Sequence, residues 1–332
     1  MPFLSICIPT FNRCDKVYKL VNDILLYTGK EIEVIVLDNC STDNTNNLLN
    51  KIIDDRFSFV QNEVNIGGIL NPLKVISLAS GEFSVLCLDK DYLDYRGIEK
   101  LIKSIKIDPE VVFGHCALNI KNERQDIIYD KGFRSVMSMA YLSRHPSGMF
   151  YKTNEYNKLD ILKSIFIERK NFSFYFDLIN GEMAMIGKSL LINLPAFYSE
   201  SKEDAVKSLS FTYDINNVYF SPAKRRIEFD AYLESVNSLE LSSNEKFKLI
   251  FRLYGQGLML STFVYKNMMA DDYVCLHNRI AKQKVGFIEL WKLNFEFSLH
   301  FFKKSLIINF IQKILIILCL DVKFTAKSFL SK

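Results

Sequence analysis

The sequence of 332 residues is 49% hydrophobic and 24% charged, with a formal net charge of +4. This composition excludes an intrinsically disordered or low-complexity chain, and the length predicts one large domain with a smaller appendage. The seven cysteines are scattered and form no CxxC pair, so we expect free thiols rather than a disulfide framework or a zinc site. No basic segment precedes an apolar stretch at the N-terminus, which predicts that the protein carries no secretory signal and stays in the cytoplasm.

Short apolar strands and amphipathic helices alternate through the N-terminal half of the chain. In chain order we expect a strand at 4–8, a helix at 15–27, a strand at 33–37, a helix from Ser41 or Thr42 to Ile53, a strand at 57–61, a helix at 67–81 and a strand at 83–88. Pro9 is expected to end the first strand, and Gly81 to stop the third helix. The strands are apolar without alternation, which predicts an α/β fold: a mostly parallel central sheet with helices on both faces.

Polar side chains follow the predicted strands at the point where each strand ends. Thr10 and Asn12 follow the first strand, Asp38 the second, and Asp89 and Asp91 the last. Ligands of such sheets bind beyond the carboxyl ends of the strands. Two carboxylates at i, i+2 suit a hard divalent cation whose coordination shell is completed by substrate phosphates and water. Taken alone, this pair is more readily explained as a polar turn, and the accompanying motifs favour a site.

Four segments in order carry a resemblance to a known family. They are Ser5–Arg13 (SICIPTFNR), Val34–Asp43 (VIVLDNCSTD), Asn65–Glu82, which begins NIGG, and Leu88–Asp91 (LDKD). Together they resemble the family 2 glycosyltransferases, enzymes of the A-type nucleotide-sugar fold. The resemblance is close over residues 3–95 and weaker as far as about residue 190.

The resemblance implies a role for each matching residue. The base and diphosphate of a nucleotide sugar would be bordered by Pro9, Thr10, Asn12 and Arg13, and the base would donate a hydrogen bond to Asp38. The ribose and phosphates would be flanked by Asn65 and Gly67. Asp89 would contact the ribose and the metal, and Asp91 would bind the metal, Mn²⁺ or Mg²⁺. A carboxylate that accepts from a base N–H favours uridine or thymidine over cytidine. Asn39, Cys40, Lys90 and Tyr92 depart from the usual family pattern.

Transfer of a sugar to a hydroxyl acceptor requires a general base. The family places an acid well downstream of the metal motif, and Asp177 and Glu182 are the two candidates. The aromatic surroundings of Asp177 suit a base, and its alternative role is to cap the helix that follows. His145 is expected either to line the acceptor site, where it would bind phosphate or sugar, or to be structural, and His115 is expected in or near the core.

The C-terminal region, residues 226–332, is predicted to be a helical appendage on a catalytic domain of residues 1–225. A weak point in its helices is expected at Gly255-Gln256-Gly257. Residues 279–332 contain ten Lys and Arg against three Asp and Glu. Polar residues interrupt the apolar segment near 300–332, so we expect a helix that lies on the surface of an anionic membrane rather than one that crosses it. The alternative is a helix pair or a homo-oligomer interface.

These observations predict an inverting, metal-dependent glycosyltransferase. It would move a sugar from a nucleotide-diphosphate donor, with a UDP-sugar favoured, to a glycan or lipid-linked oligosaccharide in cell-surface polysaccharide biosynthesis. Inversion is implied by the resemblance alone. The protein would lie at the inner face of the cell membrane, and no nucleic acid partner is expected. Two alternatives stay open: a non-catalytic scaffold subunit that binds nucleotide sugar, and a sugar nucleotidyltransferase, which would require a glycine-rich basic loop near the first strand.

Overall fold

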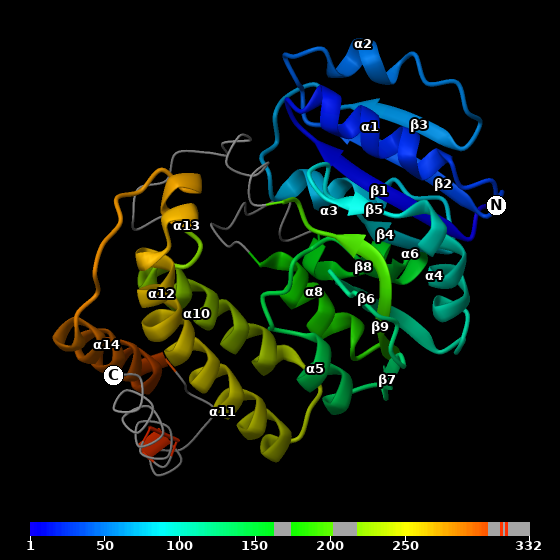
Figure 1. Ribbon diagram of the computed structural model, residues 1–332. Helices are drawn as coiled ribbons and strands as arrows, with labels where there is room; N and C mark the ends of the chain where they lie inside the picture. Colours follow the sequence, from blue (N-terminus) through cyan, green and yellow to red (C-terminus); the bar gives the residue numbers. More distant parts are fainter. Residues whose placement is uncertain (163–173, 202–217, 305–312, 315, 318–332) are drawn as a thin grey trace. The chain divides into compact units, whose positions relative to one another are not determined.

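The computed structural model describes residues 1–162, 174–201, 218–304, 313, 314, 316 and 317 (Figure 1). The chain divides into two compact units, one of residues 1–171 and 175–200 and the other of residues 172–174 and 201–332. The domain boundary expected after residue 225 stays a prediction.

The first unit contains a sheet and the helices that cover it. Its strands are β1 (Leu4–Thr10), β2 (Ile32–Asp38), β3 (Phe57–Gln61), β4 (Phe83–Leu86), β5 (Tyr92–Leu93), β6 (Val111–Leu118), β7 (Ile127–Tyr129), β8 (Met149–Lys152) and β9 (Lys188–Tyr198). Its helices are α1 (Cys14–Leu25), α2 (Thr45–Leu49), α3 (Leu70–Ser77), the 3₁₀ turn η1 (Tyr95–Gly97), α4 (Ile98–Ile105), α5 (Phe133–Met139), α6 (Thr153–Asn157) and α8 (Tyr175–Met183).

The nine strands found in the described residues form one sheet in the order β3-β2-β1-β4-β8-β6-β9-β5, with β7 paired to β9 (Figure 1). Neighbours among β3, β2, β1 and β4 are parallel. β8 lies antiparallel between β4 and β6, and β6 is parallel to β9. The predicted α/β fold with a central sheet is confirmed. The strands β1 to β4 pair with one another only in parallel, whereas the remaining strands make both parallel and antiparallel pairs.

Helices cover both faces of the parallel part of the sheet. Leu4, Ile6 and Ile8 of β1 share one buried core with apolar residues of α1 and α4. Successive side chains of a strand alternate, so Ser5 points to the opposite face, where α3 packs against β1. An added Cβ at Gly81, after α3, would lie 2.6 Å from Ser5 Oγ. Both faces of β1 are therefore buried, as its uninterrupted apolar sequence predicts.

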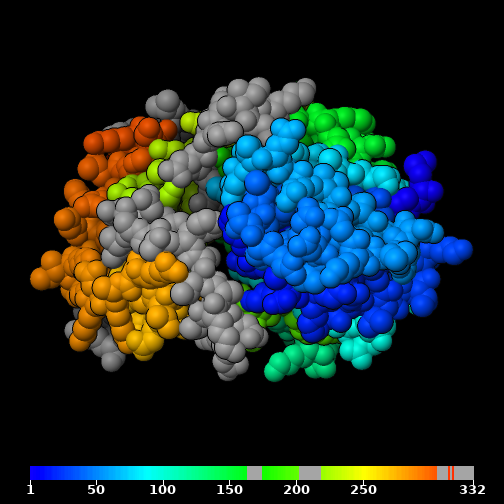
Figure 2. Space-filling view, turned by 90° about the horizontal axis from the view of Figure 1, so that it is seen from above, coloured from blue at the N-terminus to red at the C-terminus, as the bar shows by residue number. Residues whose placement is uncertain are grey.

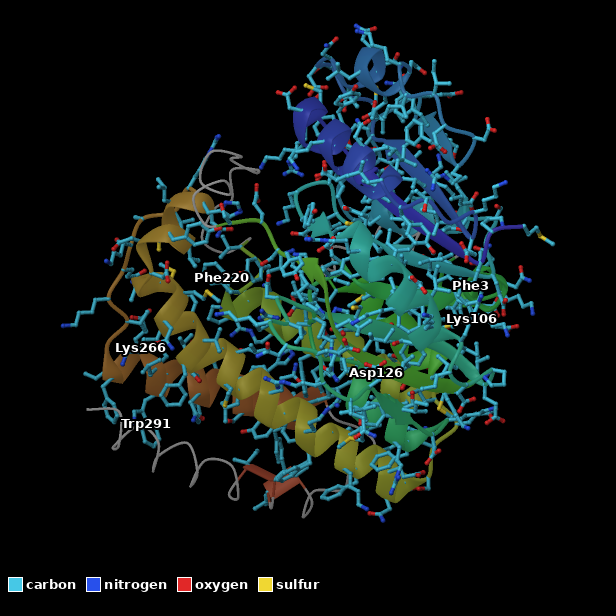
Figure 3. The ribbon with its side chains drawn as sticks, turned by 45° about the vertical axis from the view of Figure 1, so that its right-hand side comes forward. Phe3, Lys106, Asp126, Phe220, Lys266 and Trp291 are labelled. Atoms are coloured by element: carbon cyan, nitrogen blue, oxygen red, sulfur yellow. The ribbon has the colours of Figure 1, made fainter. Side chains whose placement is uncertain are left out.

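A cation–π contact lies at the amino end of β1, next to this core. Lys106, directly after α4, places Nζ 4.3 Å from the centre of the Phe3 ring, and both residues are labelled in Figure 3. The Phe3 ring lies 5.5 Å from that of Phe83 in β4. Figure 2 shows the outer surface of this N-terminal region in blue. The contact lies at the end of β1 away from the polar residues that follow the strand, so it contributes to packing rather than to the site.

β1 continues through Pro9 to Thr10, so the prediction that Pro9 ends the strand is wrong. The Cys87 N–H donates to the carbonyl of Cys7, which therefore faces β4. Pro9 is two residues further on and faces the same side, but the pairing of β1 with β4 ends at Cys7. The missing N–H of proline thus costs the sheet no hydrogen bond, and the strand can extend.

Two helix boundaries also differ from the prediction. α2 begins at Thr45, so Ser41 and Thr42 do not cap it, and the Ser41 hydroxyl donates to Asp38 instead. α3 ends at Ser77, before Gly81. This glycine does not stop the helix; its hydrogen side chain permits the close approach to β1 described above.

The second unit is helical in its described residues. Its elements are α10 (Pro222–Ser238), α11 (Ser243–Met259), the π-helical turn η2 (Leu260–Val264), α12 (Tyr265–Ala270), α13 (Asp272–His277) and α14 (Phe287–Lys304). α11 runs unbroken through the predicted weak point at Gly255-Gln256-Gly257. An added Cβ at Gly257 would overlap the ring of Phe297 in α14. The glycine is therefore required for the close packing of α11 on α14 rather than for a helix break.

The predicted interfacial segment near 300–332 lies mostly outside the described residues. Within it the structure describes only the end of α14 and residues 313, 314, 316 and 317. In the described part of the chain, no helix combines the length and the apolar character that crossing a bilayer requires.

Candidate active site

Asp89 follows β4 and is held by side chains from β1 and the loop after it. Thr10 Oγ1 donates to Asp89 Oδ2 over 2.8 Å, and Arg13 Nη1 donates to Asp89 Oδ1 over 2.8 Å. Asp89 is buried. This burial raises the pKa of its carboxyl group, whereas the Arg13 charge and hydrogen bonds from Thr10, Arg13 and the Phe11 N–H act to lower it. The first and fourth sequence motifs thus meet in one ion pair, in which Asp89 is buried and Arg13 is half-buried.

Asp91 is also buried, but its partners come from other segments. Ser147 donates its hydroxyl to Asp91 Oδ2, and the main-chain N–H of Glu200 donates to Oδ1 over 3.2 Å. The Ser147 hydroxyl also accepts the N–H of Leu88 over 2.9 Å. His145 Nε2 lies 3.5 Å from Asp91 Oδ2. The second carboxylate of the motif is therefore positioned by the turn before β8 and by Glu200, two residues after the end of β9.

The register of β8 explains why Ser147 reaches this motif. β8 pairs antiparallel with β4, with Phe150 opposite Val85. Continuing the same register places Ser147 opposite Leu88, in agreement with the hydrogen bond between them. Gly148 has a φ of +84°, a conformation that suits glycine, so the turn can deliver the serine to the end of β4.

Two histidines flank the same turn. His145 Nδ1 accepts the Ser147 N–H over 3.3 Å, which assigns the proton of the neutral ring to Nε2, on the side of Asp91. Burial lowers the pKa of His145, while the Asp91 charge acts to raise it. His115 of β6 is buried, with Nε2 3.2 Å from the carbonyl of Ser147, and burial lowers its pKa to about 4. Both rings are therefore neutral near neutral pH.

The residues around Asp91 fit a cation that is shared with a diphosphate. Among the residues that the structure describes, no three His, Cys, Asp or Glu side chains are grouped so that they could hold a metal ion. Mg²⁺ and similar cations need only one or two carboxylates when phosphate oxygens and water fill the other positions. Asp91 Oδ2 accepts the Ser147 hydroxyl and Oδ1 the Glu200 N–H, which leaves each oxygen a further lone pair. Asp89 would be the weaker ligand, because the Arg13 guanidinium already balances its charge and it also accepts the Phe11 N–H.

Asp38, at the end of β2, is buried and accepts hydrogen bonds from the loop after β2 and from β3. Ser41 donates its hydroxyl and its main-chain N–H, and Gln61 Nε2 donates over 2.8 Å. The Asn12 N–H donates to Ser41 Oγ over 2.8 Å, and the side-chain Oδ1 of Asn12 accepts the Thr42 N–H over 2.8 Å. The Ser41 N–H is shared between both oxygens, so each oxygen of Asp38 accepts two hydrogen bonds. The loops after β1 and β2 are thus joined around this carboxylate.

A network of asparagines shapes the neighbouring loop before α3. Asn39 Nδ2 donates to Asn65 Oδ1 over 2.8 Å, and Asn39 Oδ1 accepts from the Ile66 N–H over 2.9 Å and from Asn62 Nδ2 over 3.2 Å. Asn65 Oδ1 also accepts the Gly67 N–H over 2.8 Å. Gly67 has a φ of +93°, and an added Cβ would meet no atom within 4 Å. The loop is held by side-chain amides and leaves an open position at the glycine.

Asp177 lies in the first turn of α8 and does not cap it, because the helix begins at Tyr175. Its Oδ1 accepts the Leu142 N–H over 3.1 Å, and its Oδ2 accepts the Ser143 N–H over 2.8 Å. Ser143 and Tyr141 both have positive φ angles, which are unfavourable for residues with a side chain. The buried Asp177 carboxylate therefore stabilises the segment 141–143, which leads to the turn that contacts Asp91.

Glu182, in the last turn of α8, has different surroundings. Burial raises the pKa of its carboxyl group, the Asp160 charge adds to the rise, and a hydrogen bond from the Ile161 N–H acts against it. These partners follow α6 and do not belong to the turn before β8. Within the described residues, Asp177 is the candidate base whose hydrogen bonds reach the segment that precedes the Asp91 contacts.

Sequence reasoning did not single out several residues that hold the site together. They are Asn39, Ser41, Gln61, Ser147 and the main chain of Glu200. Asn39 and Ser41 lie inside a recognised motif, so their position was a usable signal. Ser147 and Glu200 reach Asp91 only through strand pairing, which local sequence patterns do not specify.

The sequence profile of Glycosyl transferase family 2 matches residues 5–170, which is half of the chain. The chain belongs to this family. The resemblance carried by the four motifs is thereby confirmed, and family 2 membership leaves no basis for the sugar nucleotidyltransferase alternative.

Curated relatives of this family 2 chain are bacterial glycosyltransferases. The GalNAc(5)-diNAcBac-PP-undecaprenol beta-1,3-glucosyltransferase of Campylobacter jejuni is 27% identical over 179 residues, which cover 52% of this chain and 55% of that protein. The UDP-Glc:alpha-D-GlcNAc-diphosphoundecaprenol beta-1,3-glucosyltransferase WfaP of Escherichia coli is 33% identical over 114 residues, 34% of this chain and 44% of that protein. The matches thus span about half the length of these two relatives.

Solved structures show the same fold at low sequence identity. The structure of residues 1–349 of S. aureus TarS has a TM-score of 0.54 and 14% identity, and covers 90% of this chain and 92% of that chain. The same TarS segment in complex with UDP-GlcNAc has a TM-score of 0.52 and 14% identity, with the same coverage. These likenesses support the A-type glycosyltransferase fold of this family 2 chain.

Proposed function

We propose that this chain is an inverting glycosyltransferase that moves a sugar from a UDP-sugar to a lipid-linked acceptor during synthesis of a bacterial cell-surface polysaccharide. The observation that carries the proposal is the set of hydrogen bonds by which Thr10 and Arg13 hold the buried Asp89 next to Asp91. It brings a cationic side chain and two carboxylates to the carboxyl ends of the parallel strands, where nucleotides bind in such folds.

The nucleotide would occupy the loops after β1, β2 and β3. Asp38 would accept the N–H of a uracil base by exchanging one of its present donors, Ser41 or Gln61, for the base. The open Gly67 position would let phosphate oxygens or ribose approach the main chain. Asp89 would accept from a ribose hydroxyl while it keeps the Arg13 guanidinium near the diphosphate. The name of WfaP, which specifies UDP-Glc, supports a uridine donor.

Asp91 would hold the divalent cation, Mn²⁺ or Mg²⁺, together with the diphosphate of the donor. When bound, such a cation stabilises the negative charge of the departing nucleotide diphosphate. Ser147 and the Glu200 N–H orient the two Asp91 oxygens, which fixes where that charge can be neutralised. The neutral His145 ring lies 3.5 Å from Asp91 and would add no competing positive charge there.

Asp177 is the proposed base that takes the proton of the acceptor hydroxyl, with Glu182 as the alternative. Main-chain N–H donors from Leu142 and Ser143 stabilise the charged form of Asp177 and orient it. A single displacement at the sugar carbon would invert its configuration. The names of both curated relatives contain a diphosphate-linked undecaprenol, which supports a lipid-linked acceptor at the inner face of the cell membrane.

Calorimetry on the full chain tests the proposal. UDP should bind in the presence of Mn²⁺ or Mg²⁺, more tightly than CDP or GDP, and EDTA should remove most of the affinity. Asp91→Ala should lower the metal-dependent affinity at least about tenfold. Asp126, labelled in Figure 3, provides a matched control, because it also accepts a serine hydroxyl, from Ser104, and a main-chain N–H, from Asn193. The Asp126→Ala variant should bind UDP normally.

Two outcomes would overturn the proposal. Equal affinity with and without EDTA would remove the cation from the site. Tight metal-dependent binding without slow donor hydrolysis, and without transfer to any undecaprenol-linked acceptor, would favour the scaffold alternative.

A further inference from the structure

α14 presents apolar side chains on its outward face. Ile288, Trp291, Phe295 and Leu299 follow one another at steps of three and four residues, which places them along one side of the helix. Ile288 is 85% exposed, Phe295 68%, Trp291 44% and Leu299 42%. Figure 3 labels Trp291 on this helix. We call these four residues the outer stripe. A surface helix in water normally presents polar side chains at such positions.

The opposite face of α14 packs against α10 and α11 of the same unit. Phe297 and Phe301 are buried. The Phe301 ring lies 4.4 Å from that of Tyr254 in α11, and the Phe297 ring lies 5.3 Å from that of Phe229 in α10. The Tyr254 hydroxyl also shares a hydrogen bond of 2.7 Å with Ser298. Because these contacts fix the rotation of α14, the outer stripe cannot turn inward without breaking them.

Basic side chains surround the outer stripe. Residues 279–304 contain six Lys and Arg and two Glu. The exposed lysines in or just before α14 are Lys284, Lys292, Lys303 and Lys304. One of the two acids, Glu296, lies 3.5 Å from Arg226 and 4.0 Å from Lys292. The apolar stripe is therefore bordered by an excess of positive charge.

We propose that the outer stripe inserts into the interfacial layer of an anionic lipid bilayer, with α14 parallel to the membrane surface. Tryptophan and phenylalanine favour the boundary between headgroups and acyl chains, and lysines at the edge of the helix contact anionic headgroups. A second copy of this chain is a poorer occupant, because a two-fold contact through this face would bring the same lysines together.

This surface is distinct from the apolar segment that the sequence singles out near 300–332. The outer stripe lies before that segment and is held by the packing of α10, α11 and α14. Insertion here does not depend on sugar transfer, so the proposed enzymatic function and this docking surface can fail separately.

Trp291 provides a direct test, because it is the one tryptophan of the chain. Adding vesicles of phosphatidylcholine and phosphatidylglycerol to the full-length protein should shift its emission to shorter wavelength, and brominated lipids should quench it. Vesicles of phosphatidylcholine alone should have a much smaller effect. Binding to anionic vesicles with an unchanged and unquenched Trp291 spectrum would overturn the proposal, since the contact would then involve another segment.

Variants in the full chain separate the apolar and charged contributions. Phe295→Ser with Leu299→Ser should weaken vesicle binding about tenfold or more. Lys292→Glu with Lys303→Glu should remove the preference for phosphatidylglycerol. Ile53→Ser is the matched control, because Ile53 is 98% exposed in the first unit, and it should bind like the unmodified protein. Thermal unfolding followed by circular dichroism establishes that each variant is folded.

Three results would contradict the proposal. They are failure of the unmodified protein to bind anionic vesicles, equal binding by the Phe295/Leu299 variant, and a dimer in sedimentation that this variant dissociates without any vesicle binding. The last result would assign the outer stripe to a contact between copies of the chain.

Discussion

The hydroxyl of Ser147 donates a hydrogen bond to the carboxylate of Asp91, although 56 residues separate the two in the sequence. The same hydroxyl accepts the N–H of Leu88 and therefore cannot rotate away without breaking a main-chain hydrogen bond. One serine thus fixes the direction of the carboxylate proposed to bind the cation. Groups that orient a metal ligand commonly affect metal affinity about 10- to 100-fold.

Ser147→Ala should weaken metal-dependent UDP binding by about 10- to 100-fold, because the Asp91 carboxylate loses a donor that orients it. Titration of Mn²⁺ followed by electron paramagnetic resonance, with UDP present, measures the effect without requiring turnover. Ser135→Ala is the control, since Ser135 is equally buried and donates to Ser189 over 2.7 Å outside these contacts. Equal losses of Mn²⁺ affinity in both variants would show that a general loss of packing is responsible.

Arg13→Met should lower the free energy of unfolding by roughly 1 to 3 kcal/mol, because it leaves the buried Asp89 carboxylate without its cation. Adding Asp89→Asn should recover part of this loss, since a neutral amide needs no counter-charge. Urea unfolding of the two single variants and the double variant measures the coupling.

A surface ion pair provides the comparison for this cycle. Lys103 pairs with Glu99 over 2.7 Å on the exposed side of α4. Lys103→Met should leave the free energy of unfolding nearly unchanged, because solvent screens such pairs. A coupling between Arg13 and Asp89 no larger than the effect of Lys103→Met would contradict a structural role for the Arg13–Asp89 pair.

Asp177→Asn should retain UDP and metal binding while transfer falls by about 100-fold or more, as expected for loss of a general base. The amide can accept only one of the two N–H donors, so stability should also fall by about 1 to 3 kcal/mol. Steady-state transfer, UDP calorimetry and urea unfolding separate these effects. Glu182→Gln should transfer normally.

Two results would reassign the acids. If Asp177→Asn loses metal-dependent UDP affinity as strongly as turnover, Asp177 acts by positioning the segment 141–143 rather than as the base. If transfer is normal in Asp177→Asn and lost in Glu182→Gln, the base is Glu182.

His115 should make the protein less stable in mild acid. Burial lowers its pKa from an ordinary value of 6.5 to about 4. Between these values the unfolded chain binds more protons than the folded one, so the free energy of unfolding decreases as the pH falls through this window, by about 3 kcal/mol in total. Urea unfolding across this pH range, compared with His115→Gln, isolates the contribution. A constant difference between the two proteins at every pH would contradict the assignment.

The strands and the site residues that follow them could be predicted because both depend on local patterns. Buried parallel strands need continuous apolar sequences, and the side chains after their carboxyl ends gather at one edge of the sheet. Thr10, Asp38, Asp89 and Asp91 were found in this way. The prediction that Pro9 ends β1 is wrong because a proline disrupts a strand only where a neighbouring strand needs a hydrogen bond from its N–H. Whether β4 needs this bond depends on how far β4 extends, which local sequence does not specify.

By itself the sequence determined the α/β fold, the family and the order of polar residues along the sheet edge, since periodicity and motif spacing are properties of neighbouring residues. Only the tertiary structure decided that Asp89 pairs with Arg13, that Asp91 is held by Ser147, and that Asp177 supports the segment leading to that serine. These pairings depend on β8 lying antiparallel beside β4, and this long-range register leaves no repeating pattern in the chain.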